Sequence, residues 1–307
     1  MATPIFRYML ALGLGVFSYH AGGSEQLTLT FPSVGSSVVI PATLVKPDGA
    51  GPYPAVVIMH DCSGLGARSS GAPLRWVHEL VSQGYVAVIP DSFTPRGFPD
   101  GVCTLPASQS KVVNGFVRAR DAYGALAALR KLSYVDGKHI GIMGGSHGGA
   151  TTLAAMSKSI HEDDPLADTK HDGFTGAVAL YPRCAQRYGD WDIVRQNGNT
   201  GPVVSYSGVY ETIAPVLILI GEKDDWTPAE YCRQMVEASR KAGYPLDIKI
   251  YPDTYHSFDS DNPVRYDPRR TNPESASGHG ATTGGNSAAW ADAKKQVRSF
   301  FAQHLKP

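Results

Sequence analysis

Three side chains in this sequence have the types and the settings for nucleophilic catalysis: Ser146, Asp224 and His256. A serine hydroxyl is a weak nucleophile at neutral pH and needs a base within hydrogen-bonding reach to take its proton. A histidine can serve as that base, and a carboxylate on its other ring nitrogen fixes the tautomer and stabilises the imidazolium. The sequence therefore predicts hydrolysis through an acyl-enzyme, provided that the fold brings these residues together.

The serine lies in a glycine-rich turn, Gly-Gly-Ser-His-Gly-Gly at residues 144–149. The apolar run at 139–143 predicts a strand before the turn, and the small residues after it predict a helix. A strand, turn and helix with the G-x-S-x-G pattern form a nucleophile elbow. Glycine is required because a Cβ at Gly144 or Gly148 would clash where the strand and the helix nearly touch. The alternative interpretation is a plain glycine–serine turn, and a suitably placed acid and histidine argue against it.

The acid and the base each follow a predicted strand. Asp224 comes after the apolar run at 214–220, and His256 comes after the alternating run at 246–251. In a doubly wound parallel sheet the C-terminal ends of the strands lie at one edge, where ligands bind. The order serine, aspartate, histidine is that of the α/β-hydrolase fold. Asp225 is an alternative acid, and we favour Asp224 because it comes first after the turn that ends the strand.

The developing negative oxygen needs two N–H donors. In nucleophile elbows the residue after the nucleophile supplies one, which is here the backbone N–H of His147. The apolar run at 54–59 predicts an earlier strand, and the loop 60–66 follows it. We therefore expect the backbone N–H of Cys62 to be the second donor of an oxyanion hole. The side chains of His60 and His147 would shape the pocket, since no ligand-spaced set around them predicts a metal site.

The remaining pattern predicts an α/β fold. Residues 26–31 and 36–44 alternate as an antiparallel N-terminal hairpin. Beyond them strands and helices alternate, which predicts a mostly parallel central sheet with helices on both faces. We expect a single α/β-hydrolase domain over residues 24–307. Further strands are expected at 85–89 and 174–181, and helices at 72–83, 113–132 and the C-terminal end.

Two segments lack a clear period. Residues 185–212 are polar and could lie over the site. Residues 259–287 are rich in Gly, Asn, Thr, Pro and Arg, and we expect them to be irregular. A structureless loop of this length is usually functional or mobile, so it either lines the pocket or forms a disordered insertion. Residues 161–164 form a charge run, which we interpret as a solvated surface rather than a metal site.

The cysteines and the N-terminus bear on the compartment. Residues 1–23 contain an apolar stretch followed by small residues, which indicates a secretory signal peptide. An even count of four cysteines agrees with export. Because the two members of each pair follow neighbouring strands, we expect the disulfides Cys62–Cys103 and Cys184–Cys232. We predict a secreted or periplasmic protein, and the alternative is a cytoplasmic enzyme with four reduced thiols.

The balance of charged residues limits the classes of partner that the protein could bind. The chain has 28 basic and 28 acidic residues, which argues against nucleic acid or a membrane surface as partner of the mature protein. A small-molecule ester is the expected substrate. Arg96 follows a strand end and could pair with a substrate carboxylate, or it could form a structural ion pair. Trp226 and Tyr255 flank the acid and the base, so they could supply an aromatic wall.

These motifs together resemble the dienelactone hydrolase family from about residue 36 to the C-terminus. The resemblance implies a single α/β domain with little or no cap, and no bound metal or organic cofactor. The matching pieces are the loop after Met59, the strand that ends in Pro90-Asp91, the elbow, the pattern Gly221-x-x-Asp224-x-x-Thr227-Pro228, and His256-Ser257-Phe258.

The chain departs from the founding enzymes of that family. They use a cysteine nucleophile and a glutamate in the loop that here holds Cys62, whereas this chain has Ser146 and, as the nearest carboxylate, Asp61. Asp61 is therefore a candidate substrate contact. The chain resembles the secreted branch with serine carboxylesterases, which implies cleavage of esters and possible action on lactones. The elbow is also similar to that of acylaminoacyl and prolyl oligopeptidases, so a peptidase or amidase is one alternative, and a non-catalytic scaffold is another.

Overall fold

A computed structural model describes residues 19–21, 24–161, 173–197 and 200–306. Most strands in this part of the chain join one large sheet. Pairing is parallel from β5 through β4, β6, β7 and β10 to β11, and antiparallel among β1, β2, β3 and β5. The sheet order is β1 (Tyr19–Ala21), β2 (Ser24–Pro32), β3 (Val39–Pro47), β5 (Val86–Pro90), β4 (Tyr53–Met59), β6 (Val135–Gly145), β7 (Ala177–Leu180), β10 (Val216–Gly221) and β11 (Leu246–Tyr251).

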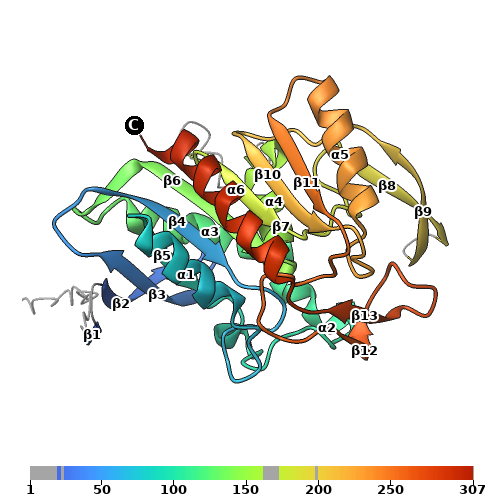
Figure 1. The fold of residues 1–307 in the computed structure, drawn as a ribbon, viewed down its shortest axis with the longest axis horizontal. Coiled ribbons are helices and arrows are strands. Elements are labelled where there is room, and N and C mark those ends of the chain that lie inside the picture. The colour runs from blue at the N-terminus through green and yellow to red at the C-terminus, as the bar shows by residue number, and fades with distance from the viewer. Residues whose placement is uncertain (1–18, 22–23, 162–172, 198–199, 307) are drawn as a thin grey trace, which may run out of the picture.

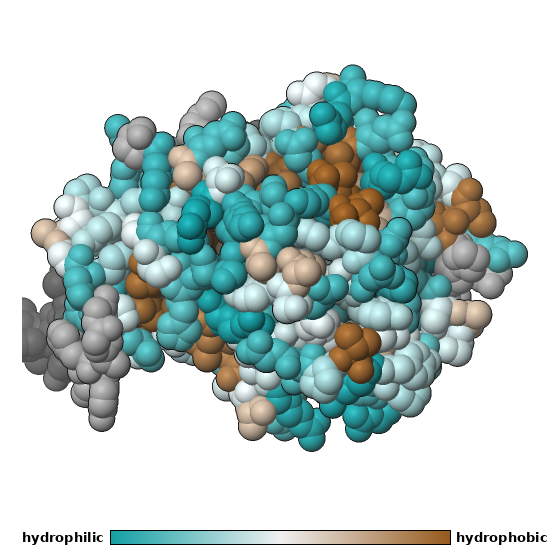
Figure 2. Space-filling model, in the orientation of Figure 1, coloured by the Kyte–Doolittle hydropathy of each residue, from teal (hydrophilic) through white to brown (hydrophobic). Residues whose placement is uncertain are grey.

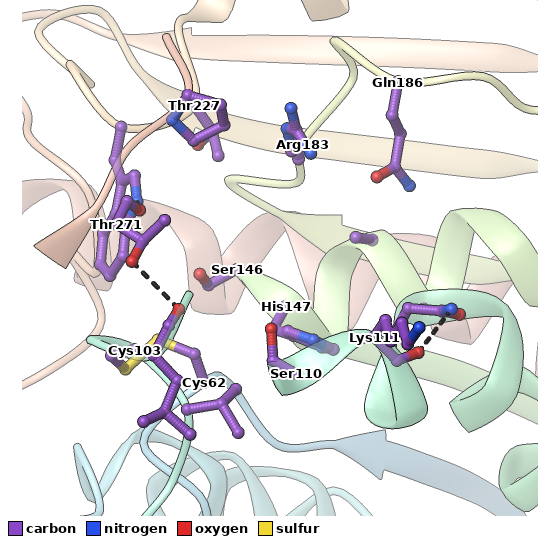
Figure 3. Close-up of a pocket in the computed structure, with 17 residues that line it drawn as sticks. Cys62, Cys103, Ser110, Lys111, Ser146, His147, Arg183, Gln186, Thr227 and Thr271 are labelled. Atoms are coloured by element: carbon purple, nitrogen blue, oxygen red, sulfur yellow. Dashed lines mark hydrogen bonds between the residues drawn. A yellow bond between two sulfur atoms is a disulfide. The ribbon is translucent and has the colours of Figure 1, made fainter. Parts of the chain in front are cut away.

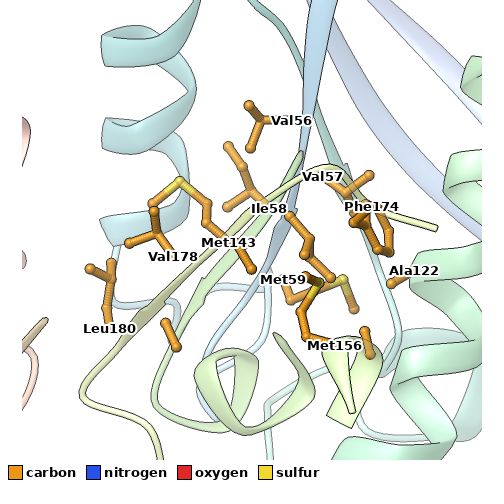
Figure 4. Close-up of a cluster of buried hydrophobic side chains, with 14 of the residues drawn as sticks. Val56, Val57, Ile58, Met59, Ala122, Met143, Met156, Phe174, Val178 and Leu180 are labelled. Atoms are coloured by element: carbon orange, nitrogen blue, oxygen red, sulfur yellow. The ribbon is translucent and has the colours of Figure 1, made fainter. Parts of the chain in front are cut away.

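The central strands are apolar along their length because both faces of the parallel sheet are covered. Every residue of β5, β7 and β10 is buried. Figure 4 shows side chains of β4, β6 and β7 gathered in this core, among them Ile58, Met143 and Val178. The core therefore fixes the register of the strands whose ends carry the candidate site.

Helices cover both faces, as the sequence predicts (Figure 1). The helices α1 (Ala72–Ser82) and α6 (Ser287–Leu305) lie on one face, and α3 (Gly115–Leu129) and α4 (His147–Met156) lie on the other. A further helix, α5 (Ala229–Lys241), packs against β10 and β11. Apolar side chains at helical spacing attach α6 to the sheet, and Val297 and Phe301 are fully buried.

The predicted N-terminal hairpin is confirmed as β2 and β3, which pair from Ser24 with Pro47 to Pro32 with Val39. Of the expected leader, Tyr19–Ala21 forms β1, and its other residues up to 23 lie outside the described part of the chain. The charge run at 162–164 lies outside it as well. The loop after β5 contains the short turns η1 (Thr94–Arg96), α2 (Ala107–Ser110) and η2 (Lys111–Val113), and η3 (Lys158–His161) follows α4.

The expectation of an irregular segment at 259–287 is wrong. This segment contains a hairpin of β12 (Arg265–Thr271) and β13 (His279–Thr283), with a shift of register in its pairing. Most side chains of β12 are exposed or only partly buried, so the sequence lacks the apolar alternation that marks a strand. The hairpin stays in place through hydrogen bonds, since Asp225 accepts from the backbone N–H and the hydroxyl of Thr282.

The polar segment 185–212 forms a second hairpin, β8 (Asp192–Asn197) and β9 (Thr200–Ser207). Figure 1 shows this hairpin beside α5, at the edge of the molecule. Of its described residues only Gln186, before the hairpin, lines the main cavity. The segment therefore reaches the cavity through Gln186, whereas no described residue of its hairpin is part of the lining.

The face of the molecule in Figure 2 is mostly hydrophilic, with apolar residues in small separate groups. The larger exposed apolar side chains of the described residues are scattered over several elements, including Leu74 on α1, Val204 on β9 and Tyr266 on β12. Scattered apolar residues are normal on a protein surface.

Candidate active site

Ser146 lies between β6 and α4 with φ 55° and ψ −116°, a backbone conformation that residues other than glycine rarely adopt. The turn around it requires glycine at positions 144 and 148. A Cβ on Gly148 would lie 1.9 Å from the carbonyl oxygen of Met59, and a Cβ on Gly144 would lie 2.6 Å from the carbonyl carbon of Gly148. The turn therefore presses the start of α4 against the end of β4 and presents the serine side chain at the sheet edge.

The three candidate residues meet at that edge. The Nε2 atom of His256 lies 2.8 Å from the Oγ atom of Ser146, and its Nδ1 atom lies 2.7 Å from the Oδ2 atom of Asp224. The side chains of the histidine and the aspartate are fully buried. This is the geometry that a general base needs, with its nucleophile on one nitrogen and an orienting carboxylate on the other.

Asp224 is held from both sides. Its Oδ1 atom accepts hydrogen bonds from the backbone N–H groups of Trp226 and Thr227, at 3.0 and 2.8 Å. Its Oδ2 atom accepts from the Thr227 hydroxyl at 2.9 Å as well as from His256. The neighbouring Asp225 instead bonds the hairpin residue Thr282. Asp224, the first of the two aspartates, is therefore the one that contacts the histidine.

Thr227 was not singled out as a site residue by the sequence analysis. Its hydroxyl lies 3.1 Å from the Nδ1 atom of His256 and also contacts the carbonyl oxygen of Tyr181 at 3.1 Å. The pattern Gly221-x-x-Asp224-x-x-Thr227-Pro228 contains it, so the signal was present without an assigned role. It braces the acid against the histidine.

Two aromatic rings enclose the imidazole of His256. The ring centroid of Tyr181 lies 4.6 Å from that of His256, and the centroid of Trp226 lies 4.9 Å away. The Tyr181 hydroxyl donates to Asp259 at 2.6 Å, and the indole N–H of Trp76 donates to the same carboxylate at 2.8 Å. Burial raises the pKa of Asp259 above its ordinary value. The histidine is thus packed tightly and cannot swing far from the serine.

The candidate oxyanion donors lie around the same cavity as Ser146, because Cys62 and His147 both line it. Within the described residues, the backbone N–H groups of Cys62 and His147 donate no hydrogen bond. His147 begins α4, so its N–H is one of the free donors at a helix N-terminus. These two backbone N–H groups are the donors that the sequence predicts.

Both histidines beside these amides are uncharged at neutral pH. Burial, together with the nearby Arg118 guanidinium, lowers the pKa of His147 to about 3. The same two causes hold the pKa of His60 well below its ordinary value. His60 donates from Nδ1 to the carbonyl oxygen of Asp61 and accepts at Nε2 from the N–H of Ser92, so its tautomer is set by two backbone groups.

The cavity in front of Ser146 has a volume of about 440 Å³ (Figure 3). Apolar groups and the disulfide form one wall, and Arg183 and Gln186 lie across from Ser146 in Figure 3. No carboxylate is among the described residues that line it. The lining comprises Cys62, Val102, Cys103, Leu105, Ser110, Lys111, Asn114, Gly115, Ser146, His147, Ala150, Arg183, Gln186, Trp226, Thr227, Thr271 and Pro273.

The structure places the four candidate substrate contacts, Asp61, Arg96, Trp226 and Tyr255, in different surroundings. Trp226 lines the cavity, whereas Tyr255 does not. Asp61 is buried and turned away, since its carboxylate accepts from the hydroxyls of Ser63 and Ser70.

Arg96 forms the structural ion pair that was its alternative role. It makes two hydrogen bonds of 2.8 Å to Asp121, whose side chain is fully buried. The side chain of Arg96 is itself 8% exposed, so it is unavailable to a substrate. The strand-end position left both roles open, because the acidic partner comes from another element, α3.

The hairpin that replaces the expected irregular segment contributes Thr271 and Pro273 to the cavity. The indole N–H of Trp226 donates to the carbonyl oxygen of Thr271 at 2.9 Å, and the Thr271 hydroxyl donates to that of Leu105 at 3.0 Å. Of the two expectations for this segment, the one in which it lines the pocket holds.

The structure pairs Cys62 with Cys103 and Cys184 with Cys232, as the sequence predicts. The first disulfide is part of the cavity wall in Figure 3, and the second joins the segment after β7 to α5. Among the described residues no three metal-ligating side chains of His, Cys, Asp or Glu type gather in one place. No described helix combines the length and apolar character that a membrane span requires.

Comparison with known proteins places the chain in a family. Residues 40–305 match the dienelactone hydrolase family. A Yersinia pestis protein with the name "Putative carboxymethylenebutenolidase" is 27% identical over 235 residues, which are 76% of this chain and 78% of that protein. Dipeptidyl-peptidase 5 of Porphyromonas gingivalis is 26% identical over 216 residues, which are 66% of this chain but 30% of that longer protein.

Solved structures agree on the fold. Thermogutta terrifontis esterase 2 in its apo form has a TM-score of 0.60 at 17% identity, covering 94% of this chain and 98% of its own. A dienelactone hydrolase-like promiscuous phosphotriesterase from metagenomic libraries has a TM-score of 0.60 at 19% identity, covering 92% and 100%. The fold and the family match over most of the chain lead to one conclusion: this chain belongs to the dienelactone hydrolase family and is a hydrolase of the α/β-hydrolase fold.

Proposed function

We propose that this protein is a serine hydrolase that cleaves carboxylic esters, including lactones, through an acyl-enzyme. The observation that carries the proposal is the position of His256, with Nε2 at 2.8 Å from Ser146 Oγ and Nδ1 at 2.7 Å from Asp224. Membership of the dienelactone hydrolase family supports the same reaction class. The roles of the individual residues follow from this arrangement.

In the first half-reaction, Ser146 Oγ attacks the carbonyl carbon while His256 Nε2 takes the hydroxyl proton. The tetrahedral intermediate then breaks its bond to the alcohol oxygen, which receives the proton from His256. In a lactone this alcohol stays attached to the acyl group. In the second half-reaction, His256 deprotonates a water that attacks the acyl carbon, and the proton returns to Ser146 as the acid leaves.

The negative oxygen of each intermediate would accept hydrogen bonds from the backbone N–H groups of Cys62 and His147. One such donor is typically worth about 3 kcal/mol of transition-state stabilisation. Their position beside the cavity and their lack of another acceptor among the described residues support this role. Asp224 would hold the histidine in the tautomer that has its free lone pair on Nε2.

The cavity suggests the kind of ester. A volume of about 440 Å³ suits a small or medium acyl group. Its described lining includes Lys111 and Arg183 but no carboxylate. Arg183 pairs with Glu274, which lies outside the lining, so Lys111 is the cation that favours substrates with an anionic group. The carboxymethylenebutenolide of the relatives' names is a lactone with such a group, and we propose it as one compound to include among the tested substrates.

A peptidase is the second candidate, because dipeptidyl-peptidase 5 of Porphyromonas gingivalis shares 26% identity with this chain. A panel of p-nitrophenyl esters against aminoacyl p-nitroanilides separates the two. We expect turnover of the esters and little of the anilides. The reverse result would replace the esterase by an amidase, and turnover of neither would favour a non-catalytic scaffold.

The decisive variant is Ser146→Ala. A fluorophosphonate probe should label the native protein and fail to label this variant, while Ser82→Ala, an exposed serine change on α1, should leave labelling intact. We expect kcat to fall by at least about three decades, as it does when a serine nucleophile is removed. Ester turnover that persists in Ser146→Ala would eliminate the mechanism.

We also propose that the protein works outside the cytoplasm. The support is the pair of disulfides, Cys62–Cys103 and Cys184–Cys232, because such bonds persist in oxidising compartments. Titration of free thiols on protein recovered from cell fractions tests this. Two intact disulfides in an extracytoplasmic fraction are expected, and four free thiols on active cytoplasmic protein would contradict the proposal.

A further inference from the structure

A buried arginine behind Ser146 has no role in the steps above. Arg118 lies on α3 with none of its surface exposed. Its Nη2 atom donates to the carbonyl oxygen of His60 at 2.7 Å, and its Nη1 atom donates to the Nδ1 atom of His147 at 2.6 Å. One guanidinium therefore holds two segments that lie far apart in the sequence.

These two segments are the ones that carry the proposed oxyanion donors. His60 comes two residues before Cys62 in the loop after β4, and His147 supplies its own backbone N–H at the start of α4. The planar guanidinium presents its donors in a fixed fork, so it sets the spacing of the two groups that it bonds. Arg118 thus spans the gap between the two halves of the hole.

No ion pair joins Arg118 to a carboxylate of the described residues, although the charges of Asp61, Asp91 and Asp121 favour its charged form from a distance. The nearby carboxylates have other partners, since Asp121 pairs with Arg96 and Asp61 accepts from two serine hydroxyls. The face of the Phe93 ring lies 4.8 Å from the guanidinium carbon. Among the described residues, the Nε atom of Arg118 has no hydrogen-bond partner.

A buried cation in such a place is expensive for folding. Removing charges from water costs several kcal/mol per ion unless good partners replace the water, and apolar residues of similar volume are often at least as stable. Burial lowers the pKa of Arg118 to about 9, which leaves it charged at neutral pH. Stability alone therefore does not account for an arginine here, whereas a negative oxygen forming in front of it would.

We propose that Arg118 is a positioning residue of the oxyanion hole, which fixes the Cys62 loop against His147 and places its positive charge behind the developing oxyanion. It does not touch the substrate in this arrangement. The inference rests on the proposed function, because it needs a reaction that passes through a tetrahedral oxyanion. It adds a requirement for a buried cation that bonds both segments carrying the proposed oxyanion donors.

The test compares Arg118→Met with Arg120→Met, a change of the same type two residues away on α3. Arg120 donates to the carbonyl oxygen of Val34, in the turn between β2 and β3. In Arg118→Met we expect kcat for a p-nitrophenyl ester to fall about 100-fold with KM changed less than about threefold, since one oxyanion donor is worth 10² to 10³ in kcat. Arg120→Met should keep the native kcat.

A trifluoromethyl ketone, which forms a tetrahedral adduct on serine, gives an independent reading. Its inhibition constant should rise in Arg118→Met by about the factor by which kcat/KM falls, because both report binding of the oxyanion. Arg118→Lys keeps a charge but lacks the fork, so we expect its kcat to lie between those of Arg118→Met and the native enzyme. A purely structural role would instead lower the fraction of folded protein and leave the inhibition constant of that fraction unchanged.

Folded fractions are measured by circular dichroism and by the endpoint of fluorophosphonate labelling. The proposal is overturned if folded Arg118→Met keeps kcat within about threefold of Arg120→Met, or if its inhibition constant for the ketone does not change. These outcomes require an active native enzyme. If the native protein hydrolyses no ester or lactone at all, it is the proposed function that fails, and the two failures are distinct.

Discussion

The candidate site has two sides that are built differently. The acid–base side consists of Asp224 and His256, which follow β10 and β11 and contact each other through side chains. The oxyanion side consists of the backbone N–H groups of Cys62 and His147, which follow β4 and β6. The first side comes from the later part of the chain and the second from the earlier part.

The two sides also differ in the interactions that hold their functional groups in position. On the acid–base side, short-range hydrogen bonds within residues 224–227 fix the carboxylate, and the carboxylate and two aromatic rings hold the histidine. On the oxyanion side, a backbone amide is only as well placed as the loop that carries it. That loop is held by long-range links, the Arg118 guanidinium and the Cys62–Cys103 disulfide. We therefore expect different substitutions to lower the activity of each side.

The largest effect is expected on the acid–base side. Asp224→Asn removes the charge and favours the wrong tautomer of His256, and a similar change costs about 10⁴ in kcat in other triads. Asp225→Asn serves as the matched control, since its side chain bonds the hairpin residue Thr282 rather than His256. Steady-state kinetics on one ester measures both. Equal losses in the two variants would mean that the acid has been assigned wrongly.

The two disulfides give the second test, because only one of them touches the cavity. The double variant Cys62→Ser with Cys103→Ser and the double variant Cys184→Ser with Cys232→Ser should each lose about 2–5 kcal/mol of unfolding free energy. Only the first should also lose kcat in the folded protein, by about tenfold, because it frees the loop of one proposed oxyanion donor. Urea unfolding and ester kinetics at low denaturant measure the two effects. A comparable loss of kcat in both double variants would contradict a specific role of the Cys62–Cys103 disulfide in holding the oxyanion side.

The smallest expected effect is on pH dependence. His147 has a folded pKa of about 3 against an ordinary value of 6.5, so the unfolded chain binds its proton more readily. The stability that depends on neutral His147 is complete above pH 6.5 and is lost as the pH falls towards 3. Between pH 7.5 and 5 this residue should contribute a loss of roughly 1–2 kcal/mol, with about 1.4 kcal/mol for each pH unit below its ordinary pKa.

Urea unfolding at both pH values measures this loss, and His147→Gln should make the dependence shallower. The exposed His78 on α1 offers a control, since His78→Gln should leave the slope as in the native protein. A slope that His147→Gln does not change would place the acid sensitivity elsewhere. His60, whose pKa burial also lowers, would then be the next residue to test.

Local patterns made the acid–base side predictable. Ser146, Asp224 and His256 each follow a recognisable apolar run, and parallel strands must bring their ends to one edge. The disulfide pairs followed from the same strand-end logic. The roles of these residues in catalysis stay a prediction until the variants are measured.

Two features were not settled by local patterns. Arg96 had two candidate roles, and the structure shows the ion pair; its partner Asp121 lies on another element, so the local sequence could not decide between the roles. The irregular interpretation of residues 259–287 failed because an exposed two-stranded ribbon buries little, and its strands need no apolar alternation. In both cases polar contacts, rather than an apolar pattern, determine the structure.

Local sequence patterns were enough to predict the core strands and helices, the nucleophile elbow and the strand-end positions of the acid and the base, because these depend on periodicity and on steric limits within a few residues. The tertiary structure decided which polar groups meet: Thr227 with His256, the hairpin with Trp226, and Arg118 with His60 and His147. Hydrogen bonds depend on the distance between two groups in space and not on their separation in the sequence, so only the folded chain reveals them.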